Sequence, residues 1–418
     1  MNIHSFVLKK AREAKAGSRA IAKVSSEQKN NALKNMADSL LKKARELESA
    51  NKKDIAAARK KGLSKAMIDR LTLNKKRINE TAQGLFEITG LPDPVGEVTK
   101  MWTRPNGMMV GRMRVPIGVI GIIYESRPNV TADATALCLK AGNAVVLRGG
   151  SEAIHSNTAI VKILRAAAKS QGIHEGVITF IDNTDRQAIM EMLKLEGLID
   201  VVIPRGGEGL IRAVTENSRI PVLKHYKGLC HVFVDRDADM EMAGDICFNA
   251  KVQRPGTCNA METMLVDEKV AGKFLPGMIR RFKKAHVKIK GCPRTRRINK
   301  AISAASEQDF FTEYVDKILN IRIVKDIDAA INHIAKYGSA HTDTIVTADY
   351  SKAMRFLKEV DSSSVFVNVS TRLSDGFQFG LGAEMGISTD KLHARGPMGL
   401  EELTCLKFIV LGDGQLRE

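Results

Sequence analysis

Hydrophobic positions along the chain follow two rhythms. Up to about residue 90, apolar residues recur at helical spacing among Ala, Lys, Leu and Glu, which predicts a series of amphipathic helices. Beyond this region, nearly continuous apolar runs of the kind found in buried parallel strands alternate with helical segments. These runs are IGVIGIIYE (117–125), AVVLRGG (144–150), GVITFID and IDVVIPRGG (199–207). Their order predicts a doubly wound α/β sheet, in which ligands bind beyond the carboxyl ends of the strands.

Two changes of pattern divide the chain. The segment LPDPVGEV ends the helical region with two prolines and a glycine, and a strand-like stretch with PNG as a hairpin turn follows it. A second series of strands and helices begins near residue 235. A glycine-rich segment from residue 373 and a final strand-like piece, TCLKFIVLGDGQLRE, close the chain. With 418 residues, this organisation predicts two or three domains.

The composition is typical of a globular protein. The chain is 44% apolar and 27% charged, and no uncharged apolar stretch is long enough to span a bilayer. The first residues lack the apolar core of a secretory signal. Six cysteines without regular spacing argue against a disulfide framework, and without CxxC or HExxH we expect no metal site. We therefore expect a cytoplasmic protein that does not bind a membrane.

The net charge of +18 raises nucleic-acid binding as an alternative class of function. Much of the excess lies in the first hundred residues, in stretches such as LLKKARELESANKKD, where it alternates with acidic residues and Ala as on a solvated helix face. Aromatic residues make up only 5% of the chain, so stacking platforms for bases are scarce. We expect no nucleic-acid partner. A basic bias also suits an enzyme that attracts anions.

One cysteine differs from the other five in its surroundings. Cys258 lies in the short polar turn QRPGTCNA, with Arg254 and Gly256 just before it. Four of the others have aliphatic neighbours, and Cys292 lies in a basic loop with no apparent partner. Cationic neighbours can lower the pKa of a thiol, and a turn leaves the sulfur accessible. Taken alone, the turn is equally compatible with a reactive cysteine and a structural one.

Several long motifs resemble one family. The stretch PIGVIGIIYESRPNVTADATALCLKAGNAVVLRGGSEA resembles the cofactor-binding half of the aldehyde dehydrogenase superfamily, although the dinucleotide fingerprint GxGxxG is absent. Together with IDVVIPRGG, NAKVQRPGTCNAMETMLV, VKDIDAAINHIAKYGSAHTDTI and FGLGAEMGISTDKLHARGPMGL, it is similar to the gamma-glutamyl phosphate reductases of proline biosynthesis. The resemblance runs from about residue 5 to the C-terminus.

The resemblance implies an aldehyde-dehydrogenase-like α/β fold in three parts. A Rossmann-like cofactor-binding domain would comprise residues 1–98 and 116–234, an α/β catalytic domain residues 235–398, and a β oligomerisation arm residues 99–115 and 399–418. The hairpin of the arm needs a partner to cover its edges. We therefore expect a homodimer or a homotetramer.

The reaction implied is the NADPH-dependent reduction of L-glutamyl 5-phosphate to L-glutamate 5-semialdehyde and phosphate, the second step of proline biosynthesis from glutamate. Cys258 matches the family's nucleophile, whose thiolate would form a thioester. A hydrolytic NAD(P)-dependent aldehyde dehydrogenase is the alternative, but such enzymes carry a general-base glutamate in an ELGG motif. The corresponding stretch here, VLKHYKGLCHVFV, has no acidic residue. Glutamate 5-kinase is a candidate protein partner.

Three residues in the motifs ESRPNV and NAKVQRPGTCNAMETMLV would assist the nucleophile. Asn129 in ESRPNV occupies roughly the place of the superfamily's oxyanion asparagine, and the alternative for it is a turn residue after Pro128. Lys251 and Arg254 would raise the thiolate fraction and attract the leaving phosphate. The alternative for both is a charge that faces solvent.

The stretch VVLRGGSEA suggests which coenzyme binds. Arg148 stands where many relatives have lysine, and Ser151 stands near the place of a glutamate that would repel a ribose 2′-phosphate. This exchange favours NADPH over NADH. The implied cofactor-binding residues are Arg148, Gly149, Gly150, Ser151, Pro204, Gly206, Gly207 and Glu313, the last near the glutamate that holds the nicotinamide ribose. For the glycine turns the alternative is packing alone.

The substrate carries a carboxylate, an ammonium group and a phosphate, so its site needs side chains of both signs. Besides Lys251 and Arg254, the motif positions imply His341, Thr342, Asn368, Arg372 and Glu384 as substrate-binding residues. The segment HARGPMGL is equally compatible with a structural crossing near a subunit interface.

Overall fold

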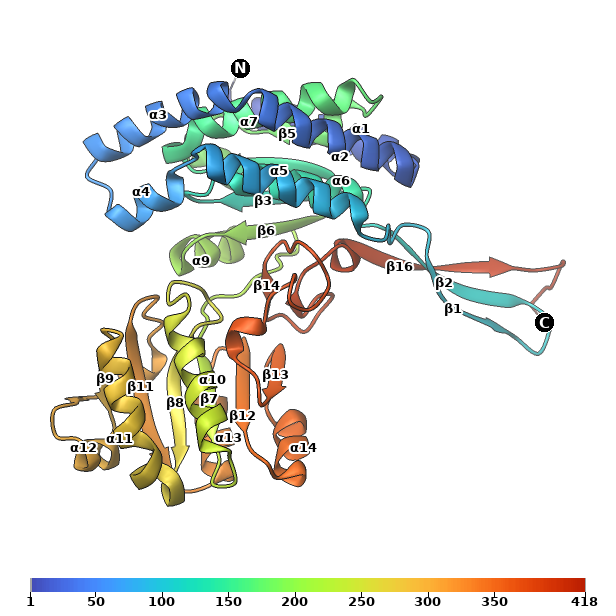
Figure 1. Ribbon diagram of the computed structural model, residues 1–418. Coiled ribbons are helices and arrows are strands. Elements are labelled where there is room, and N and C mark those ends of the chain that lie inside the picture. Colours follow the sequence, from blue (N-terminus) through green and yellow to red (C-terminus); the bar gives the residue numbers. More distant parts are fainter. Residues whose placement is uncertain (1, 418) are drawn as a thin grey trace. The chain divides into compact units, whose positions relative to one another are not determined.

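The computed structural model describes residues 2–417, which divide into two compact units (Figure 1). The first unit runs to Lys224 and also includes Gly380–Gly386 and the chain from Met398 onward. The second comprises His225–Phe379 and Ile387–Pro397. Helices and parallel sheets occur in both, which confirms the predicted α/β class. Within the described residues, no helix combines the length and the apolar character that crossing a membrane requires.

Four parallel strands form the central sheet of the first unit, in the order β5-β4-β3-β6. Their bounds are β3 Val119–Tyr124, β4 Ala144–Gly149, β5 Ile178–Phe180 and β6 Val201–Arg205. Every residue of β3, β4 and β5 is buried, which explains why these strands have continuous apolar sequences instead of alternating ones. The predicted strands of this unit are therefore confirmed.

Helices cover the sheet of the first unit. They are α1 Ile3–Ile21, α2 Ser26–Lys42, α3 Ala44–Lys60, α4 Lys65–Leu71, α5 Lys75–Gly90, α6 Asn129–Lys140, α7 Ile154–Lys169, α8 Gln187–Met192 and α9 Glu208–Asn217, with short 3-10 turns at Ser151–Ala153 and Glu175–Val177. Side chains of Asn2, Ser25 and Ser64 cap the first turns of α1, α2 and α4 by accepting backbone N–H groups. Val7 and Ala11 of α1 pack with β3 and β4 in one hydrophobic cluster.

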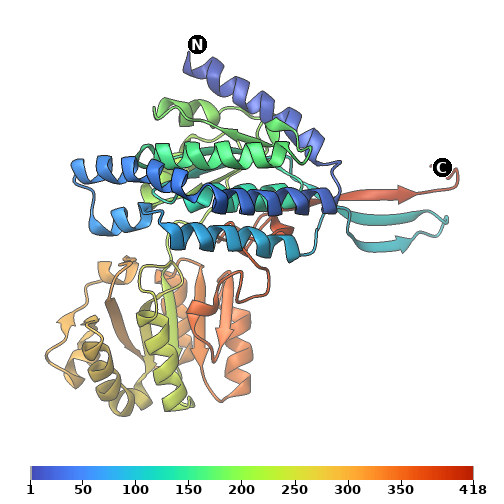
Figure 2. The ribbon, with the colours of Figure 1, turned by 45° about the horizontal axis from the view of Figure 1, so that its top comes forward.

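The arm is a separate antiparallel sheet of three strands, in the order β1-β2-β16. β1 (Val98–Thr103) and β2 (Met109–Pro116) form the hairpin, and β16 (Thr404–Leu411) pairs with β2 along its whole length. Figures 1 and 2 both show these strands extending away from the helices of the first unit. Several apolar side chains of the arm are exposed, among them Phe408 at 60%.

Seven parallel strands form the sheet of the second unit, in the order β10-β9-β11-β8-β7-β12-β13. Their bounds are β7 Cys230–Val234, β8 Met261–Asp267, β9 Lys288–Gly291, β10 Ser303–Ala304, β11 Ile318–Val324, β12 Thr342–Val346 and β13 Ser364–Val367. The helices are α10 Met240–Val252, α11 Glu268–Lys284, α12 Pro293–Ile298, α13 Ile327–Tyr337 and α14 Tyr350–Glu359. The remaining short elements are β14 Ile387–Ser388, β15 Gly396–Pro397 and 3-10 turns at Gln308–Phe311, Thr371–Leu373 and Glu401–Leu403.

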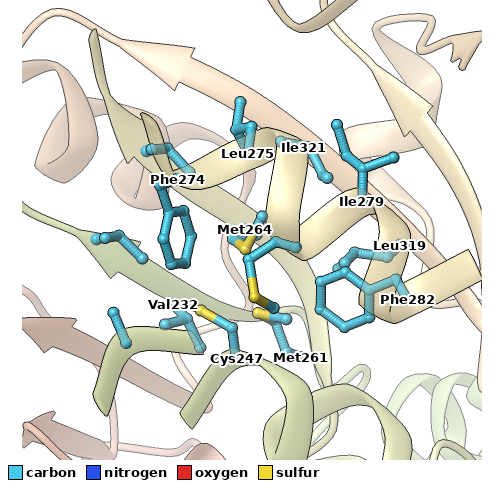
Figure 3. Close-up of a cluster of buried hydrophobic side chains, with 14 of the residues drawn as sticks. Val232, Cys247, Met261, Met264, Phe274, Leu275, Ile279, Phe282, Leu319 and Ile321 are labelled. Carbon is cyan, nitrogen blue, oxygen red and sulfur yellow. The ribbon is translucent and has the colours of Figure 1, made fainter. Parts of the chain in front are cut away.

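Two hydrophobic clusters hold this second sheet between its helices. In one, Cys247 of α10 and Ile279 and Phe282 of α11 pack against Met261 and Met264 of β8 (Figure 3). The other cluster joins β7 and β8 to α13 and α14, with Phe233, Leu265, Ile334 and Phe356 among its buried members. The sheet therefore has helices packed on both of its faces.

The boundary between the units differs from the predicted division at 234/235. β7 pairs with β8 and β12, so the segment Cys230–Val234 belongs to the second sheet and the boundary lies before it. The sequence CHVFV is fully buried and would suit either sheet, because an apolar run does not specify which strands it pairs with. The segment Gly380–Gly386, predicted as part of the catalytic domain 235–398, belongs to the first unit.

Candidate active site

The turn that holds Cys258 lies at the amino edge of the second sheet. α10 ends at Val252, the turn follows, and β8 begins at Met261. Cys230 begins the neighbouring strand β7, and His341 directly precedes β12 on the far side of β7. Three adjacent strands therefore bring these residues together at their amino ends.

The backbone of Cys258 is held by contacts from the start of β7. A Cβ built on Gly228 would overlap the carbonyl oxygen of Cys258, so the close approach requires glycine. The same carbonyl accepts a hydrogen bond from the Sγ of Cys230 at 3.2 Å. Glu313 Oε1 accepts the N–H of Gly228 at 3.0 Å. Glu313, predicted as a cofactor residue, thus supports the turn of Cys258, whose side chain is partly exposed.

Two histidines lie beside the sulfur of Cys258. One ligand atom each of His225, Cys258 and His341 lies within 4.8 Å of the others, and the two imidazole rings meet edge to face at 5.5 Å. Nδ1 of His341 lies 2.8 Å from the hydroxyl oxygen of Thr342 and 3.7 Å from the Sγ of Cys230. The structure thus places the predicted residue His341 beside Cys258, with Thr342 in contact with His341, and it adds His225, which the sequence did not indicate.

Two arginines flank the turn of Cys258. Arg372 donates to Asn259 Oδ1 and, at 2.9 Å, to Gln253 Oε1. Burial lowers the pKa of Arg372, and the positive charge of Arg254 acts in the same direction, while the Cys258 thiolate acts in the opposite one. Arg372 therefore lies close enough to Cys258 to act electrostatically on it, and Arg254 lies close enough to act on Arg372. An arginine keeps its charge at any working pH.

Lys251 is placed differently from the two arginines. Its side chain is fully buried, and its ammonium lies 2.9 Å from Oε2 of Glu262. The other oxygen of Glu262 accepts the N–H of Val315 at 3.2 Å. Burial raises the pKa of Glu262 to about 7 against the effect of the nearby cation. The charge of Lys251 is thus used in a buried ion pair inside the second unit.

Asn368 lies at the other edge of the same sheet. It follows the last residue of β13, and its amide both donates to the carbonyl of Thr347 and accepts the N–H of Thr347, each at 2.9 Å. Its backbone has φ 58°, in the left-handed region that asparagine tolerates. The structure therefore does not bring Asn368 together with Cys258, because the two stand at opposite ends of the strands.

The predicted cofactor residues Arg148 to Ser151 lie at the end of β4 and just after it, at the carboxyl edge of the first sheet. Arg148 donates through Nη1 to the carbonyl of Gly149 and through Nη2 to that of Thr184, each at 3.0 Å. The Nε of Arg148 is buried and has no hydrogen-bond partner among the described residues. The same is true of Nδ2 of Asn157, an atom that a Cβ on Gly149 would overlap. Unpaired buried donors beside a glycine turn fit an acceptor-rich ligand such as a dinucleotide. The hydroxyl-bearing Ser151 is exposed.

An acid next to Ser151 lies against the glycine turn, where Ser126 binds it. Oε1 of Glu152 accepts both the N–H and the hydroxyl of Ser126, and a Cβ on Gly150 would overlap the same carboxylate. Ser126 has φ 42°, so this loop takes the left-handed conformation that few residues adopt. No sequence motif indicated this pair.

The remaining predicted cofactor residues lie where the strand order of the first sheet reverses. The chain runs β3, β4, β5 in one direction and then places β6, with Pro204, on the other side of β3. At that point Oε2 of Glu125 accepts the N–H of Gly207 at 3.0 Å and lies where a Cβ on Gly206 would stand. A Cβ on Gly207 would meet no atom within 4 Å. Such a reversal is the usual ligand-binding point of a doubly wound sheet.

Asn129 and Glu384 also belong to the first unit. Asn129 opens α6, and its Nδ2 donates to Asp133 Oδ2 at 2.9 Å. Burial raises the pKa of Asp133 to about 6, while the hydrogen bond from Asn129 and the charge of Arg205 act against the rise. Glu384 is half-buried in the segment Gly380–Gly386, whose last glycine lies against the guanidinium of Arg205.

The sequence motifs missed four acids and bases that shape these sites. They are Glu125, Asp133, Glu152 and His225. Glu125 is the last residue of the predicted strand 117–125, which was a usable signal for a residue at the ligand-binding edge. His225 offered none, because its partners stand 33 and 116 positions further along the chain, and only the order of the strands brings the three together.

The chain is similar to known proteins over nearly its full length. Residues 5–317 match the family model described as "Aldehyde dehydrogenase family". The chain is 68% identical over 418 residues, covering 100% of both chains, to a gamma-glutamyl phosphate reductase of Thermodesulfovibrio yellowstonii. A gamma-glutamyl phosphate reductase of Caldanaerobacter subterraneus is 56% identical, over 98% of this chain and 99% of its own. The crystal structure of a gamma-glutamyl phosphate reductase from Thermotoga maritima matches with a TM-score of 0.97 and 48% identity, over 99% of this chain and 100% of the other.

Proposed function

The chain belongs to the aldehyde dehydrogenase family, as one of its gamma-glutamyl phosphate reductases, and from this premise we propose that Cys258 carries the acyl group while L-glutamyl 5-phosphate is reduced. Members of this family are oxidoreductases that use a nicotinamide coenzyme, and the names of the relatives connect the chain with proline biosynthesis. The observation that carries the proposal is the partly exposed sulfur of Cys258, on a backbone fixed by Gly228 and Cys230 and flanked by Arg254 and Arg372.

The proposed reaction has two stages at this sulfur. The thiolate of Cys258 attacks the carbonyl carbon of the acyl phosphate, the bond from that carbon to the phosphate oxygen breaks, and inorganic phosphate leaves. The resulting thioester is then reduced, the bound coenzyme supplying the hydride. The carbon–sulfur bond finally breaks, which releases the aldehyde and restores the thiolate.

Charged and polar side chains would assist these stages. Arg254 and Arg372 would favour the thiolate over the thiol and attract the leaving phosphate. The amide of Asn129 would donate to the oxygen that becomes negative, and Asp133, which already accepts from Nδ2 of Asn129, would fix the orientation of that amide.

NADPH is the coenzyme that we propose. Ser151 offers an exposed hydroxyl at the turn after β4, and the carboxylate of the neighbouring Glu152 is taken up by Ser126. Arg148 contributes positive charge at the same turn, although its Nη1 and Nη2 donate to main-chain carbonyls. A 2′-phosphate would therefore meet the hydroxyl of Ser151 and the charge of Arg148 there, beside a carboxylate that already accepts two hydrogen bonds from Ser126.

The dependence of the reverse reaction on phosphate tests the proposed chemistry. With L-glutamate 5-semialdehyde and NADP⁺, the reduction of NADP⁺ should require phosphate, or arsenate in its place, because an acyl group on Cys258 needs an oxyanion acceptor. Equal rates without either anion would favour a hydrolytic aldehyde dehydrogenase. The covalent stage is tested separately by quenching the enzyme during turnover, digesting it and finding the acyl group by mass spectrometry on the peptide that contains Cys258. A label on another peptide would refute the assignment.

We also propose that the arm mediates association between copies of the chain. Phe408 is 60% exposed, with Trp102 edge to face at 6.5 Å and the guanidinium of Arg112 at 5.0 Å. Phe408→Lys should weaken self-association at least tenfold, since buried aromatic anchors dominate interfaces. Tyr350→Lys is the control, because Tyr350 is 76% exposed on α14 of the second unit. Light scattering that gives the same mass for both variants over a dilution series would contradict the proposal.

A further inference from the structure

The side chains of His225, Cys258 and His341 form a cluster that the reaction proposed above does not explain. Two imidazoles and a thiolate are ligand types that Zn²⁺ prefers. One ligand atom from each residue already lies within 4.8 Å of the other two. In a tetrahedral zinc site with ordinary bond lengths, such atoms stand roughly 3.3–3.6 Å apart. The ligand atoms would therefore have to approach one another by about 1.5 Å at most.

From this geometry we propose that the cluster is a zinc-binding site in which the metal withdraws the nucleophile from the reaction. The proposal rests on the role of Cys258 proposed above. Three protein ligands would leave the fourth position of Zn²⁺ for water or an anion. A thiolate bonded to zinc is far less nucleophilic than a free one, so the metal-bound enzyme could not form the thioester. Zinc would act as a reversible inhibitor and not as a cofactor.

The contacts around two of the ligands support a site that is partly built in advance. His341 is fully buried, and its Nδ1 lies 2.8 Å from the hydroxyl of Thr342. This contact fixes the ring in the way that outer-shell partners fix metal-binding histidines. The backbone of Cys258 is held by the close approach of Gly228 and by the Sγ of Cys230. His225, at the start of the second unit, is half-buried, and we expect most of the adjustment at its side chain.

The positive charges near the cluster set a limit on the affinity. Arg372 acts electrostatically on Cys258, Arg254 acts on Arg372, and both charges would oppose a divalent cation. The thiolate, and the carboxylate of Glu313 that accepts the N–H of Gly228, offset part of this charge. We therefore expect zinc to bind reversibly, to be removed by chelators, and to compete with the anionic substrate.

Cobalt substitution reports on the site independently of turnover. Co²⁺ added to the purified, reduced enzyme should produce a thiolate-to-cobalt charge-transfer band and the visible bands of a tetrahedral site, with one ion per chain, and Zn²⁺ should displace it. His225→Asn and Cys258→Ser should each weaken binding about 10–100-fold or more. His286→Asn and Cys292→Ser are matched controls, since these residues lie in the same unit outside the cluster, and both should bind metal as the unaltered chain does.

The inhibition is measured on the unaltered enzyme and on the two controls. Zinc should inhibit all three, and EDTA should restore the activity. Metal binding that survives Cys258→Ser or His225→Asn would overturn the proposal, as would a fully metal-loaded enzyme that turns over normally. Failure of the proposed function looks different, because Cys258→Ser would then be active without any metal present.

Discussion

In the first unit, the glycine turns that fit a coenzyme lie at the carboxyl ends of β4 and β6, whereas in the second unit Cys258 and His341 lie at the amino ends of β8 and β12. Both sheets are parallel and have helices packed against them, so the difference does not come from the class of fold. The two edges differ in which end of the neighbouring helices faces the bound group.

At a carboxyl edge, the loop after a strand leads into the first turn of a helix, whose free N–H groups attract anions. The N–H of Gly207 at the start of α9 is such a group. At an amino edge, the loop instead follows the C-terminus of a helix, here that of α10, which disfavours negative charge. A thiolate at that edge therefore needs cations of its own. In the proposed function, Arg372 beside Cys258 and the nearby Arg254 would supply them.

The replacement Cys258→Ser tests the amino edge with the largest expected effect. A serine hydroxyl keeps the size of the side chain but is a much poorer nucleophile near neutral pH, so kcat should fall about 10⁴-fold or more. Coenzyme binding, followed by fluorescence titration, should change little. Cys292→Ser is the control, because Cys292 is also a partly exposed free thiol of the second unit. Near-normal turnover of Cys258→Ser would show that Cys258 is not the nucleophile and that the reaction does not take place at this edge.

The next largest effect is expected beneath the amino edge, at the buried pair of Lys251 and Glu262. Lys251→Met leaves the carboxylate of Glu262 buried without its cation, which should lower the free energy of unfolding by about 3–5 kcal/mol in urea titrations. The double variant Lys251→Met/Glu262→Leu should recover most of the loss. Lys336→Met breaks the exposed pair with Glu307 and should cost at most about 1 kcal/mol.

The pH dependence of the same variant has a definite sign. Burial raises the pKa of Glu262 from 4.5 to about 7, and removal of Lys251 raises it further. Above pH 4.5 the folded chain then holds a proton that the unfolded chain has lost, so stability falls as the pH rises toward 7 and beyond. Lys251→Met should therefore be closer to the unaltered chain in stability at pH 5 than at pH 8. A constant difference would mean that Glu262 is not the titrating group.

Hydrophobic patterning predicted the strands of both sheets because they are buried on both faces. It could not assign Cys230–Val234 to a sheet, since pairing depends on partners far away in the sequence. The burial of Lys251, by contrast, could have been predicted from the sequence. Lys251 stands four residues after Cys247 and seven after Gly244 on α10, both of them buried, and this spacing puts it on the buried face of the helix.

The candidate site was predictable only where residues adjacent in sequence carry it. The turns RGGSEA and PRGGEG each contain their glycines within a few positions, and the family motifs indicated Cys258 and His341. His225 and Gly228 gave no signal, because their effect on Cys258 depends on β7 lying beside β8. Asn368 was expected at the substrate because of its position in the family motif, four residues before Arg372. The chain turns back after β13, and this places the two at different edges.

Replacements of Arg372 and Asn368 therefore test directly whether substrate binding depends on the amino edge or the carboxyl edge of the second sheet. Arg372→Leu removes a charge beside Cys258 and should raise the KM for phosphate in the reverse reaction about 10–100-fold, as expected for a lost charge-assisted hydrogen bond. Arg372→Lys should recover part of the loss. Asn368→Gly suits the positive φ but removes both hydrogen bonds to Thr347, so it should lower Tm and leave KM unchanged. An equal rise of KM in both variants would contradict the comparison.

The smallest effect is expected at the carboxyl edge of the first sheet. Glu125 accepts the N–H of Gly207 at the start of α9, where the proposed coenzyme would place its phosphates. Glu125→Gln keeps an oxygen that can accept this N–H but removes a negative charge that would repel them, so the KM for NADPH should fall about two- to fivefold. The gain should shrink at high salt, since screening weakens the repulsion that the replacement removes. Glu216→Gln, an exposed position near the other end of α9, is the control and should change nothing. A rise of KM in Glu125→Gln would instead mean that the carboxylate itself holds part of the coenzyme, such as a ribose hydroxyl, and that the first turn of α9 does not receive the phosphates.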